Sequence, residues 1–556
     1  MSFDVVVLGG GGAGLAAALF ASMMGLKPVV IESTEYLGGT TALSAGSVWI
    51  PGTPQGLAVN PDDTTARAAA YLAAASGVHG RPDMQRRFLE LGPAAVAMLD
   101  AGSAVRLRAY PYHPDYLQEL EGASLNGRVL EATPFDGRRL GAALGMVRPP
   151  IAAFTLFGGM MVDRTDIRHL LGARSSWESA RHAAGLVLRH ARDRLRGRRS
   201  TRMVMGNALI GALLHSLLER KVEIHLRTEV LALRRSDGRV VGVDVRGPGG
   251  PATVMAQGGV ILAGGGFNRH PGLRGRLIPD VEIFTPGAPG NRGGLIALAL
   301  ELGARLGDEG HGHAFWSPVS VRKETDGTEA IFPHFVLDRA KPGTLVVDQS
   351  GRRFLNESTS YTLFARAMIA AHGTRRDMPC FLIADDRALR AYGLGMVRPG
   401  GWGARAARRS GYLVSGASLA ELAARLGVDA VGLAATAARM NGFSASGVDP
   451  EFGRGSTAYQ RNLGDPAFSP NPTLGPIVTA PFHAVRLYPG DIGASTGLVT
   501  NGDARVLGPD GPIPGLFAVG NDMQSVMAGA YPGPGITLGP AIAFAYGAAQ
   551  AIATSR

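Results

Sequence analysis

The beginning of the chain constrains the fold most. Residues 4–8 form a short apolar run, residues 9–14 read GGGGAG, and a helix-like segment, LAAALFASMMG, follows. Within the turn, Gly9, Gly11 and Gly14 fit the pattern GxGxxG, in which glycine permits a tight turn, close approach to a pyrophosphate and close packing of helix on strand. The N-terminus of the helix would then face the phosphates.

A second strand-like segment follows this helix. The sequence PVVIE ends in Glu32, at roughly the spacing where the motif places a carboxylate that accepts hydrogen bonds from a ribose. Because strand, turn, helix and terminal acid are in register, we predict a dinucleotide-binding βαβ unit. A glycine-rich turn that serves only packing is the alternative interpretation.

The size and composition of the chain indicate a globular protein with more than one domain. Its 556 residues exceed what one hydrophobic core usually serves, and they can bury a large ligand. Hydrophobic residues make up 46% and charged residues 18%, a balance that argues against disorder.

The cysteine and histidine positions exclude several kinds of site. Cys380 is the only cysteine, so structural disulfides, a CxxC redox pair and cysteine-rich zinc sites are ruled out. Its context, MPCFLIAD, predicts a buried strand thiol. His311 and His313 have no third ligand at a usable spacing, and we therefore assign no metal.

Two uncharged stretches, residues 5–26 and 526–555, could be mistaken for membrane spans. Both are dense in glycine, and neither forms one continuous apolar helix, so we predict that both belong to the protein core. The N-terminus enters a strand-like run without a basic segment or a cleavage site, which predicts a cytoplasmic protein.

The positive charge of the chain is concentrated in one segment. The formal net charge is +11, and residues 164–202 contain eleven arginines and three acidic residues. Trp177, Leu186 and Leu195 lie among these arginines, as in a basic amphipathic helix at an anionic bilayer surface. A solvated helical face is the equal alternative. Nucleic acid is excluded as a partner because no helix-turn-helix, zinc or RNP signature accompanies the charge.

A family resemblance begins at residues 36–53, YLGGTTALSAGSVWIPGT. The segment GGTTALSAG after a dinucleotide-binding unit resembles the flavoproteins of the fumarate reductase and 3-ketosteroid dehydrogenase superfamily. TEVLAL around Val230, GGVILAGGGFN up to Asn268 and GLFAVGN up to Asn521 match further segments of the same group, in the same order. The resemblance implies non-covalently bound FAD as the cofactor.

The resemblance also implies which residues hold this FAD. They are Gly9, Gly11, Gly12, Ala13, Gly14, Glu32, Ser33, Gly39, Thr40, Thr41, Ser44, Ala45, Gly46, Val230, Gly264, Asn268, Gly520, Asn521, Thr537 and Leu538. The sequence departs from the usual family pattern at residues 290–295, which read GNRGGL where the family usually has GDG before a helix.

The implied fold is α/β, with a Rossmann-like FAD-binding domain interrupted by an inserted α+β substrate-binding domain. We expect the FAD-binding domain in residues 1–283 and 488–556, and the inserted domain in residues 284–487. A basic insertion at about residues 151–202 belongs to the first part. The active site is expected where the two domains meet.

The motifs around two tyrosines limit the resemblance to one group within this superfamily. Residues 356–361 read NESTSY and end in Tyr361, and residues 529–535 read GAYPGPG and contain Tyr531 and Gly535. These motifs are similar to those of the 3-ketosteroid Δ1-dehydrogenases (3-oxosteroid 1-dehydrogenases). The resemblance implies that Tyr361 abstracts the C2 proton, that the Tyr531 hydroxyl and the Gly535 amide hold the C3 carbonyl, and that a hydride passes from C1 to flavin N5.

These roles agree with the chemistry of desaturation beside a ketone. A C2 proton becomes acidic when the carbonyl oxygen can carry enolate charge, and two fixed donors in a dry cleft stabilise that charge. Gly535 suits the amide role because it lacks a Cβ atom. Tyrosine has an ordinary pKa near ~10, so the Tyr361 phenolate needs a neighbouring donor or a positive potential.

The resemblance places such a donor in an early tyrosine-rich segment. Here that segment reads AYPYHPDYLQELEGAS, and we select Tyr116, with Tyr112 in reserve. The family's usual segment is shorter before its glycines, whereas this chain continues through YLQEL to Gly122.

We therefore predict an FAD-dependent enzyme that introduces a 1,2 double bond into 3-ketosteroids. The alternatives are a 3-keto-5α-steroid Δ4-dehydrogenase, a fumarate-reductase-like enzyme acting on unsaturated acids, and a non-catalytic flavin-binding protein at a membrane. Small dicarboxylates would need converging cations, but the Tyr531 loop has no arginine and AFWSPV around Trp316 indicates an apolar wall.

The two remaining predicted partners are an electron acceptor and the membrane. Without iron–sulfur cysteines or a haem-binding CxxCH motif, an external electron acceptor such as a quinone must reoxidise the flavin. We also expect the basic insertion to cover the substrate entrance and to face the inner side of the membrane.

Overall fold

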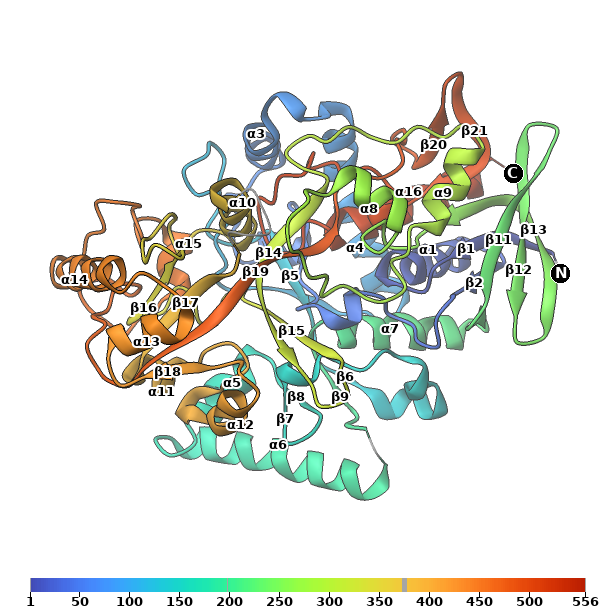
Figure 1. Cartoon of the computed structure of the whole chain (residues 1–556). Helices are drawn as coiled ribbons and strands as arrows, with labels where there is room; N and C mark the ends of the chain where they lie inside the picture. Colours follow the sequence, from blue (N-terminus) through green and yellow to red (C-terminus); the bar gives the residue numbers. More distant parts are fainter. Residues whose placement is uncertain (1, 198, 373–377, 556) are drawn as a thin grey trace.

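The computed structural model describes residues 2–197, 199–372 and 378–555. Its largest sheet has eight strands and lies at the end of the molecule that carries both termini (Figure 1). The strand order is β10-β2-β1-β13-β12-β11, with β21 beside β13 and β20 beside β21. The bounds are β1 (Ser2–Leu8), β2 (Pro28–Ile31), β10 (Glu223–His225), β11 (Glu229–Ser236), β12 (Arg239–Gly247), β13 (Gly250–Leu262), β20 (Arg505–Gly508) and β21 (Gly511–Ala518).

The centre of this sheet is parallel and apolar. Strand β1 pairs in parallel with β2 and β13, and β13 pairs in parallel with β21. Val5, Val6, Val7 and Leu8 are fully buried because both faces of a parallel sheet are covered. The apolar, β-branched run that opens the sequence therefore becomes the middle of the core.

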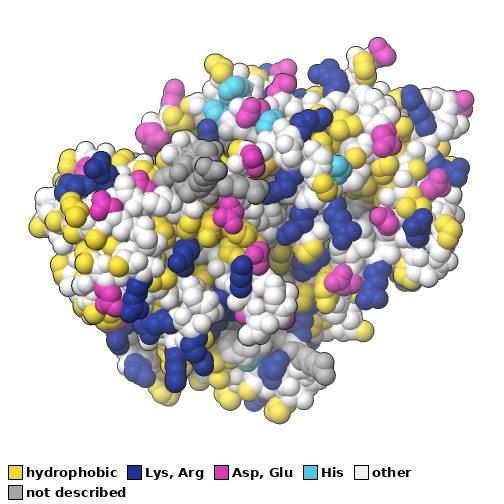
Figure 2. Space-filling model, viewed as in Figure 1, with side chains coloured by type: hydrophobic (Ala, Val, Ile, Leu, Met, Phe, Trp, Pro, Cys, Tyr) yellow, Lys and Arg dark blue, Asp and Glu magenta, His cyan; other side chains and the backbone are white. Residues whose placement is uncertain are grey.

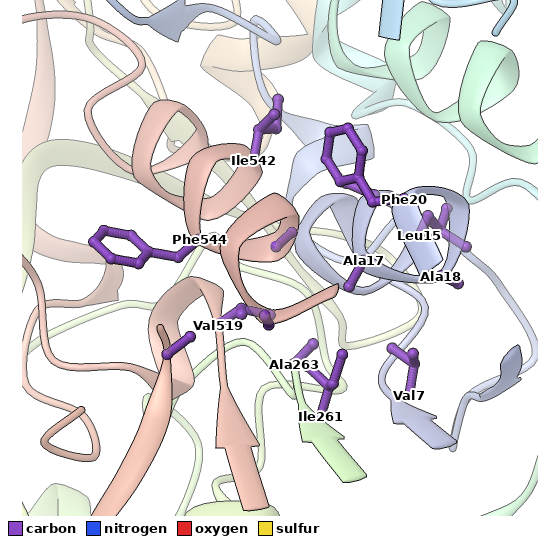
Figure 3. Close-up of a cluster of buried hydrophobic side chains, with 14 of the residues drawn as sticks. Val7, Leu15, Ala17, Ala18, Phe20, Ile261, Ala263, Val519, Ile542 and Phe544 are labelled. Carbon is purple, nitrogen blue, oxygen red and sulfur yellow. The ribbon is translucent and has the colours of Figure 1, made fainter. Parts of the chain in front are cut away.

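Two helices pack together on one face of this sheet. Figure 3 shows α1 (Gly12–Met23) and α16 (Leu538–Thr554) side by side above Val7, Ile261 and Val519. Phe20 and Ile542 on these helices are buried in the same core. The first and last helices of the chain thus close over one dinucleotide-binding sheet.

A second sheet of six antiparallel strands lies on the other side of the molecule (Figure 1). Its order is β15-β14-β19-β17-β16, with β18 beside β19. The buried Cys380 begins β17, as its sequence context predicts. The bounds are β14 (Ala314–Lys323), β15 (Glu329–Pro333), β16 (Thr344–Val347), β17 (Cys380–Asp385), β18 (Val414–Gly416) and β19 (Phe482–Ala494), and the associated helices include α10 (Tyr361–His372), α11 (Asp386–Tyr392), α12 (Ala404–Arg409), α13 (Leu419–Leu426) and α14 (Ala430–Ser446).

Strand β19 is long and pairs with different strands of this second sheet along its length. Its residues 482–487 pair with β17 and residues 488–494 pair with β14. The predicted fold class, a Rossmann-like α/β unit interrupted by an α+β unit, is confirmed. The expected boundary between residues 487 and 488 falls inside β19, and the division into domains stays a prediction.

The basic insertion, at about residues 151–202, is mostly helical. It contains β7 (Thr155–Leu156), β8 (Met160–Met161), α5 (Arg164–Leu171) and α6 (Trp177–Arg196). The Ser176 hydroxyl caps α6 by accepting a hydrogen bond from the Ser179 amide. Arg198, one of the eleven arginines, lies outside the described residues. Among the helices of the described ranges, none has the length and apolar character needed to cross a bilayer.

Candidate functional site

One large cavity lies between the two sheets. Its volume is about 1280 Å³, above the roughly 300–1,000 Å³ that is usual for a single small ligand. Most of the predicted site residues line it, from the N-terminal glycine loop to the end of the chain. They are Gly9, Gly11, Gly12, Ala13, Glu32, Ser33, Gly39, Thr40, Thr41, Ser44, Ala45, Gly46, Tyr116, Val230, Tyr361, Gly264, Gly520, Asn521, Tyr531, Gly535, Thr537 and Leu538.

The glycine loop forms a backbone cradle at one wall of this cavity. A Cβ atom at Gly9, which has a φ of +111°, would lie 2.3 Å from the Ala263 carbonyl oxygen. A Cβ atom at Gly11 would meet no protein atom within 4 Å and would point into open space. Helix α1 begins here without a side-chain cap, so its first amides are free to bind an anion. The cradle fits the pyrophosphate of a dinucleotide.

The Glu32 carboxylate is held in place by the backbone. Its Oε2 accepts a hydrogen bond of 2.7 Å from the Gly10 amide, and its Oε1 accepts one of 2.8 Å from the Thr34 amide. Glu32 is buried yet lines the cavity. It is therefore fixed at the end of β2, where a ribose would meet it.

The GNRGGL segment supplies a polar contact beside the cradle. The Asn291 side-chain amide donates to Thr40 Oγ1 at 3.0 Å, and the Ala288 amide donates to the same oxygen at 3.0 Å. Asn291 also lines the cavity. The departure from the family's usual GDG pattern thus retains a polar side chain at this wall.

Gly14 and Asn268 are the two predicted cofactor residues that do not line the cavity. A Cβ atom at Gly14 would lie 1.9 Å from the Gly9 carbonyl oxygen, so this glycine permits α1 to pack on the turn. Asn268 Nδ2 donates to Asp491 Oδ2 at 3.1 Å. Both residues support the cavity wall from behind, and a direct contact of either with the cofactor stays a prediction.

Four tyrosines form one cluster, and three of them, Tyr116, Tyr361 and Tyr531, line the cavity. The ring centroid of Tyr361 lies 5.1 Å from that of Tyr531 and 5.5 Å from that of Tyr116. The ring of Tyr116 also lies 4.5 Å from that of Tyr459, at an angle of 43°. Tyr361 is the first residue of α10, whereas Tyr531 belongs to the loop before α16. Residues from distant parts of the chain thus meet in one cluster.

The loop that carries Tyr531 also presents a free amide. Gly535 has a φ of +93°, and a Cβ atom there would lie 2.4 Å from the Ser47 carbonyl oxygen. The Gly535 carbonyl accepts hydrogen bonds from the Trp49 and Gly539 amides, but its own N–H donates to no other group of the described chain. This amide is available to a ligand beside the Tyr531 hydroxyl.

Burial controls the acidity of the tyrosine hydroxyls. Burial raises the pKa of Tyr361 and of Tyr116 well above the usual value. Burial also raises the pKa of Tyr531, against hydrogen bonding with the Tyr361 and Thr537 hydroxyls. A phenol in this setting needs a further stabilising charge before it can act as a base.

The structure separates the two candidates in the early tyrosine-rich segment. Tyr116 is buried in the cluster, whereas Tyr112 is 44% exposed at the rim of the cavity. Ile167, Val336 and Leu337 are the other large apolar side chains that are both exposed and part of the lining. The mouth of the cavity is therefore apolar, and helix α5 contributes to it.

Several residues of the site are missing from the sequence prediction. Asp522 accepts hydrogen bonds of 2.5 and 2.8 Å from the Gly264 and Gly266 amides and so fixes the second glycine turn. Tyr459 and Arg339 lie at the tyrosine cluster, and neither belongs to a recognisable motif. Only Asp522, directly after the GN pair of GLFAVGN, carried a signal that could have indicated it.

The chain belongs to the FAD binding domain family, because the family model matches residues 4–538. It is a flavoenzyme, and FAD is its cofactor. Among curated proteins it is 36% identical to the 3-oxosteroid 1-dehydrogenase of Mycolicibacterium smegmatis, covering 100% of this chain and 97% of that protein. It is 37% identical to the 4-oxocyclohex-2-ene-1-carboxylate 5-dehydrogenase of Sinomonas cyclohexanicum, covering 99% and 93%.

A solved structure is similar along its whole length. The 3-ketosteroid Δ1-dehydrogenase of Sterolibacterium denitrificans, in complex with 1,4-androstadiene-3,17-dione, superposes with a TM-score of 0.91 at 34% identity and covers 100% of both chains. The similarity predicted from the NESTSY and GAYPGPG motifs is confirmed.

Proposed function

We propose that this protein is an FAD-dependent 3-oxosteroid 1-dehydrogenase. The observation that carries the proposal is the convergence of Tyr361, Tyr531 and the free Gly535 amide at one wall of the cofactor cavity. A base and two hydrogen-bond donors at one place are what desaturation beside a ketone requires.

Each residue of the site has a separate role in the desaturation. The Tyr531 hydroxyl and the Gly535 amide donate hydrogen bonds to the C3 carbonyl oxygen and stabilise the enolate charge that develops there. The Tyr361 oxygen takes the proton from C2, and Tyr116 supports the phenolate form of Tyr361. FAD, when bound, would supply the acceptor for the hydride that leaves C1. The buried ring cluster keeps water away from the carbon that loses the proton.

The cavity favours a steroid over a small keto acid. An anionic substrate needs a cation that is free to pair with it. Two cations that line the cavity are already engaged. Arg164 pairs with Glu131 at 3.3 Å and lies over the Tyr110 ring at 3.9 Å, and Lys341 donates to the Gly464 carbonyl at 2.7 Å. The rim formed by Tyr112, Val336 and neighbouring side chains is apolar. A 4-oxocyclohex-2-ene-1-carboxylate, for which the relative from Sinomonas cyclohexanicum is named, fits this lining less well.

The insertion supports a peripheral membrane contact. Trp177, Leu188 and Leu195 on α6 are 84%, 57% and 88% exposed, an unusual state for apolar side chains among arginines. Figure 2 shows Lys and Arg side chains gathered on the lower left of the molecule, where Figure 1 places α5 and α12. We infer that this face binds an anionic bilayer and directs the cavity mouth toward membrane-dissolved steroid. An external acceptor such as a quinone would reoxidise the flavin.

Anaerobic incubation of the purified yellow protein with a panel of 3-ketosteroids tests the proposal. The flavin absorbance should bleach, and the product should have lost two hydrogens between C1 and C2. A double bond at C4 would favour the Δ4-dehydrogenase, and bleaching only by 4-oxocyclohex-2-ene-1-carboxylate would favour a small keto acid as the substrate. A spectrum unchanged by every ketone would leave a flavin-binding protein without this activity.

A further inference from the structure

Arg339 is a fully buried cation beside the tyrosine cluster. Its neighbour in the chain, Ala340, packs in one buried group with Tyr116, Tyr361 and Tyr459. The guanidinium donates hydrogen bonds to four backbone carbonyls: to those of His334 and Phe335 at 3.0 and 2.9 Å, and to those of Glu357 and Thr359 at 2.5 and 2.6 Å.

Two of these carbonyls belong to the turn that carries Tyr361. Residues 357–359 directly precede Ser360 and the first residue of α10. Because Arg339 holds both the Glu357 and the Thr359 carbonyl, it fixes the path of the chain into Tyr361. The guanidinium therefore helps to hold the predicted base, Tyr361, in place.

The charge of Arg339 is not neutralised by an ion pair. Within the described ranges, no carboxylate pairs with this guanidinium, whereas the buried Arg353 and Arg454 both pair with Glu357. The Asp338 carboxylate beside it is already bound by His334 Nδ1 at 2.8 Å and by the Gly395 amide at 2.8 Å. A buried cation without a paired carboxylate is costly, and its positive potential acts on the neighbouring groups.

Tyr459 lies next to the Arg339 side chain and to Tyr116. It is 1% exposed, its ring centroid is 4.5 Å from that of Tyr116, and its hydroxyl interacts with the Arg339 side chain. Burial raises the pKa of Tyr459 to about 12, while the charge of Arg339 acts in the opposite direction. The same charge lowers the pKa of Tyr116 against the larger effect of burial.

Two other basic side chains approach the cluster. The ring centroid of His113 is 6.4 Å from that of Tyr116, but burial lowers the pKa of His113 to about 4, so the ring is neutral at pH 7. Lys341 lines the cavity and donates to the Gly464 carbonyl at 2.7 Å, and burial lowers the pKa of its ammonium group. Arg339 is therefore the permanent positive charge at the cluster.

We propose that Arg339 is the charge that favours the deprotonated form of one hydroxyl of the cluster, and that Tyr459 and Tyr116 transmit its effect to Tyr361. The inference rests on the proposed function. When Tyr361 acts, the C2–H bond breaks, an O–H bond forms on Tyr361, and the bonding electrons enter the enolate held by Tyr531. The proton then passes through the Tyr116 hydroxyl to water, which restores the phenolate. Arg339 touches no substrate and is a positioning residue.

The pH dependence of kcat/KM tests this role. A positive charge lowers the pKa of a phenol, so Arg339→Met should shift the acid limb of the profile to higher pH, by about one unit or more. Below the midpoint this corresponds to an about tenfold lower rate, which recovers at high pH. Arg339→Lys should shift the limb by less than half as much. Arg454→Lys, a buried arginine paired with Glu357, is the matched control and should leave the midpoint unchanged.

A second variant and a second measurement keep the test independent of folding. Tyr459→Phe removes one hydroxyl from a buried ring and should also shift the acid limb upward, with the FAD content unchanged. Exchange of the C2 hydrogen in deuterated water with the reduced enzyme reports proton transfer without hydride transfer. This exchange should be slower in Arg339→Met and Tyr459→Phe than in the unmodified enzyme.

Three outcomes would overturn the inference. The first is an Arg339→Met rate lower by the same factor at every pH, which indicates only a structural role. The second is exchange at an unchanged rate in both variants. The third is an absence of exchange in the unmodified enzyme, which would overturn the proposed function as well, whereas the first two leave that function standing.

Discussion

The ring of Tyr361 meets the ring of Tyr531 at an angle of 64°, with the ring centroids 5.1 Å apart. Tyr361 begins a helix beside the second sheet, and Tyr531 belongs to the loop before the last helix of the chain. The contact forms only when both parts of the chain are folded together. Variants that remove one hydroxyl but keep the ring can therefore separate chemistry from assembly.

Tyr361→Phe should abolish steroid turnover and leave FAD bound. Removal of a general base costs about 10²–10⁴ in rate, whereas the ring still fills its buried site. Turnover with a 3-ketosteroid and an artificial acceptor, together with the flavin absorbance, measures both effects. Tyr412→Phe is the matched control, because Tyr412 is equally buried but bonds Ser320 away from the cavity. Substantial turnover by Tyr361→Phe would contradict its role as the base.

Tyr531→Phe should lower kcat by about 10²–10³, because one of two donors to the developing oxyanion is lost. The FAD content should stay the same. A kcat within a few-fold of the unmodified enzyme would show that the Tyr531 hydroxyl does not hold the carbonyl.

Gly535→Ala should lower both kcat and the melting temperature, since the added Cβ would lie 2.4 Å from the Ser47 carbonyl oxygen.

Two glycines of the N-terminal turn should respond differently to substitution. Gly11→Val places its side chain in open cavity and should raise the Kd for FAD at least about tenfold, because the pyrophosphate can no longer approach the backbone. Gly14→Ala forces α1 away from the Gly9 carbonyl and should lower the stability of the apoprotein by about 1–3 kcal/mol. Fluorescence titration with FAD and thermal unfolding measure the two effects. Equal responses in both assays would contradict this division.

The exposed apolar residues of α6 should govern binding to anionic vesicles. Replacement of Trp177, Leu188 and Leu195 by serine should abolish flotation with vesicles containing phosphatidylglycerol, and deletion of residues 164–202 should do the same. Val78 and Val431, which are 97% and 79% exposed, provide the control substitutions. Unchanged flotation after the deletion would remove the membrane proposal.

Local sequence patterns predict much of this fold and of the cofactor wall. The apolar run before Gly9, the glycine spacing and the acid at Glu32 lie close together in the chain, so their geometry follows from a single βαβ unit. Tyr361 and Tyr531 are predicted as site residues because they lie in recognisable motifs. Arg339 and Tyr459 cannot be predicted in this way, since their proposed role depends on long-range burial and on a guanidinium without a carboxylate partner among the described residues, which no local pattern encodes.

The sealed position of Cys380 in β17 has a practical consequence for following motion at the cavity mouth. Burial raises the pKa of this thiol above its usual value, so the native chain presents no reactive sulfur to alkylating reagents. A single Leu337→Cys substitution at the rim would therefore accept one fluorophore without any prior removal of native cysteine. Arrival and departure of ligands would become visible as changes in the emission of that dye.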